Sequence, residues 1–199
     1  MKTIATLSRE IGEWAQANFG NTPVTNLLVR NHDDEINSEP LQGRIVELNW
    51  IAPLWGIGEE IGELCKQSTW SNGSWLDESE VKDAIADTGI YFCDYLYRRG
   101  FTYNVFNSAP KVHKHLCISL AEAYGELLHV ELKHAQGIRG MNEIQPFKSA
   151  HKLACQSIYG SLQSGSNAFT GKRLEILIDD VFQETVSKRN WKKNKESGN

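Results

Sequence analysis

The amino-acid sequence predicts an all-α protein of about six helices arranged as a bundle. Apolar residues recur at intervals of three and four through most of the chain, which is the period of amphipathic helices. The sequence shows neither strand alternation nor a βαβ rhythm, and we expect no β-hairpin. The 199 residues have 40% hydrophobic content, which is enough to bury one sizeable core or two small ones.

The first half of the chain is expected to contain a helix, a loop and a second helical segment. Residues 3–18 form the first helix, and residues 20–42, rich in Asn, Asp and Pro, form a loop with an optional short helix at 24–30. Another apolar-periodic segment begins at 43–52. Pro53 either kinks this segment or occupies the first turn of the helix that follows. The first helix has four apolar positions at helical spacing: Ile4, Leu7, Ile11 and Trp14.

The second half is expected to be helical except for its connections. After Gly100, a linker of mixed aromatic and polar character covers residues 101–110. A long helix is expected at about 112–136, ended by glycine, and another at 147–162. A loop rich in Gly, Ser and Asn follows, and the last helix is expected at 172–188.

Residues 56–94 carry the strongest functional signal. They contain nine acids and two bases, a net charge of −7 in a chain whose total is −4. Three acids fall within about 100° of one another on the first helix of this stretch: Glu59, Glu60 and Glu63. After a turn of Trp, Ser, Asn and Gly, a second helix places four acids on one face: Glu80, Asp83, Asp87 and Asp94.

Two explanations of these acidic faces are open. Both helices are amphipathic, and their acids can simply face water. However, solvated faces usually mix signs, because like charges four residues apart are destabilising. Two acidic faces turned toward each other would repel unless divalent cations lay between them, and all-oxygen carboxylate sites suit Mg²⁺ or Mn²⁺.

The segment Glu59-Glu60-x-x-Glu63, followed on the next helix by DAIAD at 83–87, resembles the MazG-type nucleotide pyrophosphohydrolases. These belong to the all-α NTP pyrophosphatases, which also include the dimeric dUTPases. The family pattern is EExxE and then ExxD. Asp87 matches the final Asp, but Ala84 stands where the pattern has Glu, so the fourth ligand is either Asp83 or Glu80. The resemblance implies one domain, with a four-helix core at about 3–100 and a helical extension at about 110–190.

The resemblance also implies an activity. The family hydrolyses a nucleoside triphosphate, ribo or deoxyribo, to the monophosphate and pyrophosphate, with Mg²⁺ or Mn²⁺, and assembles as homodimers or larger oligomers. Glu59 is then expected to orient or deprotonate water. The expected metal ligands are four carboxylates: Glu60, Glu63, Asp83 and Asp87. Four further residues are expected to bind substrate: Lys66, Tyr91, Arg189 and Trp191.

Each of these substrate-binding residues also has a structural explanation. Lys66 can offset Glu63, and Tyr91 can pack at the edge of the core. The basic end of the last helix, which contains Arg189 and Trp191, suits the helix dipole. Alternatively, that end folds over the nucleotide, in the same chain or across a dimer. A non-catalytic module that binds a nucleotide or a partner protein is the alternative function, and Ala84 favours it.

Other features of the sequence argue against several classes of protein and of metal site. No segment resembles a membrane span or a signal peptide, and four separated cysteines indicate free buried thiols in a reducing cytoplasm. The mild net acidity argues against a general nucleic-acid binder. Two E-x-x-H motifs, ending at His129 and His134, point about 140° apart on one helix, so they cannot share a metal. Glu122-x-x-Gly125-Glu126-Leu127 repeats the spacing of Glu59-x-x-Gly62-Glu63-Leu64, either through a degenerate duplication or by chance.

Overall fold

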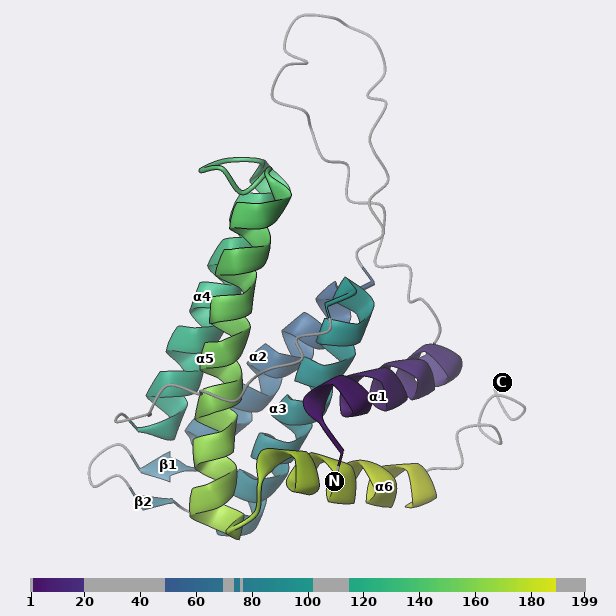
Figure 1. Ribbon diagram of the computed structural model, residues 1–199. Coiled ribbons are helices and arrows are strands. Elements are labelled where there is room, and N and C mark those ends of the chain that lie inside the picture. Colours follow the sequence, from purple (N-terminus) through teal and green to yellow (C-terminus); the bar gives the residue numbers. More distant parts are fainter. Residues whose placement is uncertain (1, 20–48, 70–73, 76, 102–114, 189–199) are drawn as a thin grey trace, which may run out of the picture.

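The computed structural model describes residues 2–19, 49–69, 74–75, 77–101 and 115–188, and this part of the chain confirms the all-α class (Figure 1). It contains six helices and one short hairpin: α1 (Ile4–Phe19), α2 (Ile51–Lys66), β1 (Ser68–Thr69), β2 (Ser74–Trp75), α3 (Glu78–Arg99), α4 (Leu116–Gln136), α5 (Ile144–Thr170) and α6 (Leu174–Lys188). None of these helices combines the length and the apolar character required to cross a bilayer.

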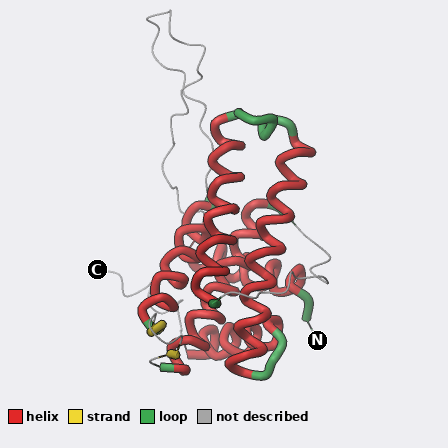
Figure 2. Tube along the Cα trace, turned by 90° about the vertical axis from the view of Figure 1, so that its left-hand side faces the viewer, coloured by secondary structure: helices red, strands yellow, loops and turns green. Residues whose placement is uncertain are grey.

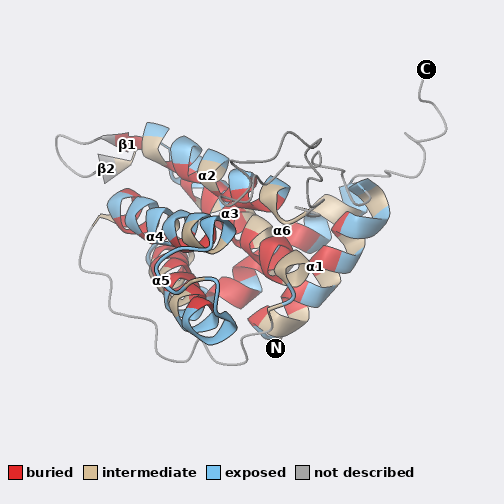
Figure 3. Ribbon diagram, turned by 90° about the horizontal axis from the view of Figure 1, so that it is seen from above, coloured by how far each residue is buried: buried red, intermediate tan, exposed pale blue. Residues whose placement is uncertain are grey.

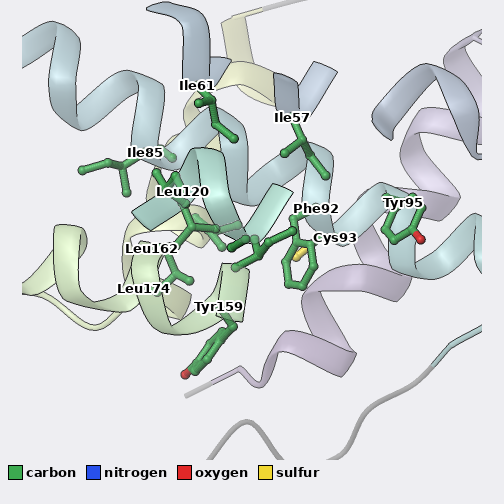
Figure 4. Packing of buried hydrophobic residues seen from close by; sticks show 14 of the residues in the cluster. Ile57, Ile61, Ile85, Phe92, Cys93, Tyr95, Leu120, Tyr159, Leu162 and Leu174 are labelled. Carbon is green, nitrogen blue, oxygen red and sulfur yellow. The ribbon is translucent and has the colours of Figure 1, made fainter. Parts of the chain in front are cut away.

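Helix α3 lies in the middle of the bundle. It contacts α1, α2, α5 and α6, and α4 and α5 form a long hairpin whose tip extends beyond the other helices (Figures 1 and 2). Figure 3 shows the same arrangement from above, with the buried faces turned inward. One hydrophobic cluster contains residues from all six helices, and Figure 4 shows part of it around Phe92 and Leu120.

The helix ends follow local sequence. The Asp77 carboxylate accepts hydrogen bonds from the backbone N–H groups of Ser79 (2.8 Å) and Glu80 (3.3 Å), which starts α3. Trp50 is the N-cap of α2, so Pro53 lies in the first turn of that helix, which is the second of the two options. The described part of α4 begins at Leu116, and the expected start at 112 falls outside the described residues.

Two expectations were wrong. A hairpin does form: β1 and β2 pair antiparallel, with Ser68 opposite Trp75. The dipeptide Asn72-Gly73, which is typical of hairpin connections, lies between these strands in the sequence and was the overlooked signal. The second error concerns residues 163–171, expected as a loop but helical as far as Thr170.

Tertiary packing and local hydrogen bonds explain the longer α5. Gly165 is buried, and a Cβ there would lie 2.8 Å from the Leu116 side chain. The Thr170 hydroxyl donates to the Ser166 carbonyl (2.7 Å), and the Ser166 hydroxyl donates to the Lys172 carbonyl (2.9 Å). Gly171 ends the helix with a φ of 66°, a left-handed conformation that favours glycine.

A buried charged network joins α3 to the α4–α5 hairpin. Glu131 accepts a hydrogen bond from the Tyr95 hydroxyl (2.5 Å), and Arg99 donates to both of its carboxylate oxygens (2.9 and 3.2 Å). The Tyr95 hydroxyl also lies 2.5 Å from Nε2 of His151. The Arg99 guanidinium is 5.0 Å from the ring centres of both Trp50 and Phe147.

This network determines the charge of its members. Burial by itself would raise the pKa of the Glu131 carboxyl, but hydrogen bonds from His151 and Arg99, the charge of Arg99 and the Tyr95 hydroxyl lower it to about 2. Burial lowers the pKa of His151 despite its contact with Glu131, so His151 is neutral near pH 7. Glu131 is therefore an ionised, fully compensated carboxylate inside the protein.

We predict that Glu131→Ala lowers the free energy of unfolding by about 3 kcal/mol, because Arg99 is left as a partly buried charge without its carboxylate partner. Urea denaturation measures this, and Glu126→Ala, an exposed acid on the same helix, should change stability by less than about 0.5 kcal/mol. The Glu131 contribution is complete above its unfolded pKa of 4.5 and is lost as the pH falls toward about 2. Equal destabilisation by both substitutions would contradict a structural role for the network.

Candidate functional site: a carboxylate cluster between two helices

The acidic faces of α2 and α3 meet because these two helices pack closely and antiparallel. At the centre of the contact the Tyr91 ring lies on the backbone of Gly56, where a Cβ would be 2.5 Å from the ring. Only glycine allows this approach without a shift of the ring. Glu60 lies one turn after Gly56, and Asp87 lies one turn before Tyr91. The antiparallel packing therefore brings Glu60 and Asp87 to the same level.

Glu60 is the centre of the cluster. It is half-buried, and its pKa is raised to about 8, first by burial and then by the charges of Asp87, Glu63, Glu59 and Asp83, in that order. Three of the predicted metal ligands and the predicted water-orienting residue are thus within electrostatic range of Glu60, the fourth predicted ligand. Such a strongly perturbed carboxyl beside like charges is typical of functional sites.

The members of the cluster differ in exposure. Glu59, Glu63 and Asp83 are exposed, and Asp87 is half-buried. Among the residues that the structure describes, no three acidic, histidine or cysteine side chains converge closely enough to surround a metal ion as placed. The backbone brings the carboxylates together, while rotation of the exposed side chains would be required to form a coordination shell.

The structure bears on the choice between Asp83 and Glu80. Asp83 is the weakest of the four charges that raise the pKa of Glu60, and Glu80 is not among these four. Ala84, where the family pattern has Glu, is buried in the hydrophobic cluster with 4% of its surface exposed. Asp83 is therefore the better placed of the two alternatives.

The four residues expected to bind substrate do not all lie at the carboxylate cluster or within the described residues. Lys66 is exposed in the last turn of α2, one turn after Glu63. Tyr91 is half-buried against Gly56 and the hydrophobic cluster, which is the structural role considered for it. Arg189 and Trp191 lie outside the described residues.

Asp94 shares the acidic face of α3 in the sequence but not the cluster. It is buried, and Arg98 donates a hydrogen bond to it at 2.8 Å. Burial raises the pKa of Asp94, and the hydrogen bond and charge of Arg98 oppose that rise. Its role is therefore structural.

Trp55 is a functional candidate that the sequence did not single out. Its side chain is 63% exposed, and it lies one turn before Glu59 on α2. An indole left in solvent beside an acidic face is unusual for a residue of this size. The helical pattern contained a signal, because Trp55 is on the same face as Glu59 and Lys66 rather than with the buried Ile57 and Ile61.

The repeated acidic pattern of α4 does not produce a second carboxylate cluster. Glu122 and Glu126 line a groove of about 750 Å³ together with His129. The opposite wall, from α5, contributes three apolar residues instead of acids: Ala150, Leu153 and Ala154. The two E-x-x-H motifs lie in different surroundings. In the second motif, Glu131 is buried in the charged network, and Nδ1 of His134 lies 2.6 Å from the Met141 carbonyl oxygen.

Comparisons with family models, with curated proteins and with solved structures found no match. The geometry of the described residues nevertheless indicates the structural class of this protein. They form an all-α bundle in which four carboxylates from two antiparallel helices raise the pKa of a fifth, half-buried Glu60.

We predict that Glu60→Gln changes how the stability of the metal-free protein depends on pH. The Glu60 pKa is raised on folding, so its favourable contribution is complete below the unfolded pKa of 4.5 and is lost as the pH rises toward about 8. Thermal melting in a chelator should therefore show the variant gaining stability over wild type across this range. Glu126→Gln, which removes an acid outside the cluster, should show no such divergence, and parallel curves for Glu60→Gln and wild type would refute the clustering.

Proposed function

We propose that this protein is a Mg²⁺-dependent nucleoside triphosphate pyrophosphohydrolase, which cleaves NTP or dNTP to the monophosphate and pyrophosphate. The observation that carries the proposal is that four carboxylates from two antiparallel helices lie near half-buried Glu60 and raise its pKa. The spacing of these acids in the sequence, which resembles the MazG-type enzymes, is independent support.

The donor chemistry fits a hard divalent cation. Glu60, Glu63, Asp83 and Asp87 offer only carboxylate oxygens, which Mg²⁺ and Mn²⁺ prefer, and rotation of the exposed Glu63 and Asp83 costs little. When bound there, the cation would supply positive charge for the phosphate oxygens and lower the pKa of the attacking water. A triphosphate needs such charge, because the acidic face alone would repel it.

The chain's own groups take distinct roles in this proposal. Glu59 points about 100° away from Glu60 on α2, so it is free to orient or deprotonate water while Glu60 acts as a ligand. Lys66, exposed one turn after Glu63, would neutralise phosphate oxygens. Trp55, exposed one turn before Glu59, would stack on the base, a contact worth about 1–3 kcal/mol. Arg189 can hold phosphate with two hydrogen bonds, and Trp191 can likewise stack on a base.

A non-catalytic module that binds nucleotides or a partner protein is the second candidate. Ala84 favours it, because the position that carries a ligand in the family pattern is here a buried apolar residue. A turnover assay separates the two candidates. Canonical and modified triphosphates are incubated with Mg²⁺, and pyrophosphate is separated from phosphate. Binding without any turnover would support the module.

For the enzyme, we predict that Glu63→Gln and Asp87→Asn each abolish turnover while leaving the metal-free fold as stable or more stable. Both substitutions remove one charge from the cluster and keep the shape of the side chain, so repulsion falls and a ligand is lost. Mg²⁺ should raise the melting temperature of wild type and fail to raise that of either variant. Glu126→Gln is the matched control and should keep both activity and the Mg²⁺ response. Near-normal activity in either cluster variant would show that the active site does not lie between α2 and α3.

A further inference from the structure

Two of the four cysteines are neighbours where the end of α2 meets the start of α4. Cys65 is in the last turn of α2, and Cys117 is the second residue of α4. The Cys117 thiol donates a hydrogen bond of 3.6 Å to the carbonyl of Leu64, the residue directly before Cys65. These two helix ends lie at the same end of the bundle (Figures 1 and 3). The fold therefore brings together two thiols that are far apart in the chain.

A second contact holds the same two helix ends together. The Ser68 hydroxyl, in β1 just after α2, lies 3.3 Å from Nε2 of His115, the N-cap of α4. Trp75 stacks on the His115 ring, with 4.9 Å between the ring centres. Leu64 and Ser68 thus flank Cys65 in the sequence, and both contact the start of α4. Cys65 is therefore held close to Cys117 from both sides.

The two thiols also act on each other. The pKa of Cys117 is raised to about 12, first by burial and then by the charge of Cys65 and a hydrogen bond with it, and a hydrogen bond with Ser68 opposes this rise. Cys93 and Cys155 are both fully buried, and no second thiol is among the main groups that shift their pKa values. A pair of interacting thiols is thus specific to this end of the bundle.

The members of the pair differ in accessibility. Cys65 is half-buried, whereas Cys117 is fully buried. Accessible thiols react with oxidants before buried ones. Within the described residues, no third acidic, histidine or cysteine side chain joins this pair closely enough to surround a metal ion with it. The arrangement therefore provides one thiol that an oxidant can reach and a second, protected thiol beside it.

We propose that Cys65 and Cys117 form a reversible disulfide when the protein meets hydrogen peroxide. The Cys65 sulfur first attacks a peroxide oxygen. An S–O bond forms, the O–O bond breaks, and a sulfenic acid and one water result. The Cys117 sulfur then attacks the Cys65 sulfur, so that the S–S bond forms, the S–O bond breaks and a second water leaves. Each sulfur loses one electron, both peroxide oxygens are reduced, and both thiol protons leave in the waters.

The disulfide would cross-link the last turn of α2, which carries Glu63 and Lys66, to the start of α4. It would close a segment of the chain that contains all of α3, which restricts the unfolded chain and stabilises the fold. A dithiol reductant would return both cysteines to thiols by exchange. The inference depends neither on the nucleotide nor on the metal, and its test uses neither.

Peptide mapping of the full chain without reduction tests the proposal. Trypsin cleaves after Lys and Arg, so each cysteine is in a different peptide, with Cys65 in 45–66 and Cys117 in 115–133. After treatment with hydrogen peroxide and alkylation of the remaining thiols, these two peptides should appear as one species, lighter by two hydrogens than their sum. Dithiothreitol should separate them again. This species should form at least about tenfold faster than any oxidised product of the buried Cys93 or Cys155.

Variants test the order of the steps. In Cys117→Ala the sulfenic acid at Cys65 has no second thiol to attack it, so dimedone, which reacts with sulfenic acids, should label Cys65 more strongly than in wild type. Oxidation should raise the melting temperature of wild type by at least about 5 °C and leave that of Cys117→Ala unchanged. Cys93→Ala, which removes a buried thiol elsewhere, is the control and should match wild type in both measurements. Circular dichroism verifies that the variants fold.

The mapping of wild type decides the outcome by itself, because it does not depend on the folding of any variant. Peptides 45–66 and 115–133 that stay separate after peroxide treatment, with Cys65 either as a thiol or as a sulfinic acid, overturn the proposal. A disulfide that joins Cys65 of two different chains, seen as a covalent dimer in gels without reductant, also overturns it. A fall in the melting temperature on oxidation would contradict the inference that the fold already holds the two thiols together.

Discussion

The structure depends on a constraint on α3, which must be packed on most of its surface and still carry an acidic face. Val81, Ile85 and Phe92 are fully buried, and four other helices contact α3. Its acidic side meets α2 across the close contact of Tyr91 with Gly56. Because this contact sets the separation of the two helices, the backbone itself holds Glu60 and Asp87 at one level.

The protein treats two inner glutamates in opposite ways. Glu131 is surrounded by donors from Arg99, Tyr95 and His151, and its pKa is lowered to about 2. Glu60 is surrounded by carboxylates, and its pKa is raised to about 8. The first arrangement joins α3 to the α4–α5 hairpin and stabilises the bundle. The second stores electrostatic repulsion at the surface, which a bound cation would relieve, and this difference separates a structural charge from a candidate functional one.

The two halves of the chain share a helical pattern but use it differently. In α2 the acids face α3, which also carries acids. In α4 the acids Glu122 and Glu126 face an apolar wall from α5, and the helix has an additional apolar face outside. The neighbour of each helix therefore decides whether its acids gather into a cluster or line an apolar groove.

The sequence alone determined the helical class, the apolar and acidic faces of α2 and α3, and the acids that those faces carry. Those features depend on helical period, which is local, and Ile57, Ile61 and Leu64 are buried as their spacing predicts. Periodicity also favoured a helix ending at about 162, but packing of Gly165 on Leu116 extends α5 to Thr170.

Only the tertiary structure decided which acids meet. Asp83 rather than Glu80 is among the charges that raise the pKa of Glu60, Asp94 is paired with Arg98, and Glu131 is joined to Tyr95 and His151 from other helices. Arg98 lies only one turn after Asp94 on α3. The other partners are far apart in the chain, and Glu80 and Asp83 are equivalent on one helical face, so no local pattern distinguishes them. The order of the helices in space and the single close contact at Gly56 make that selection.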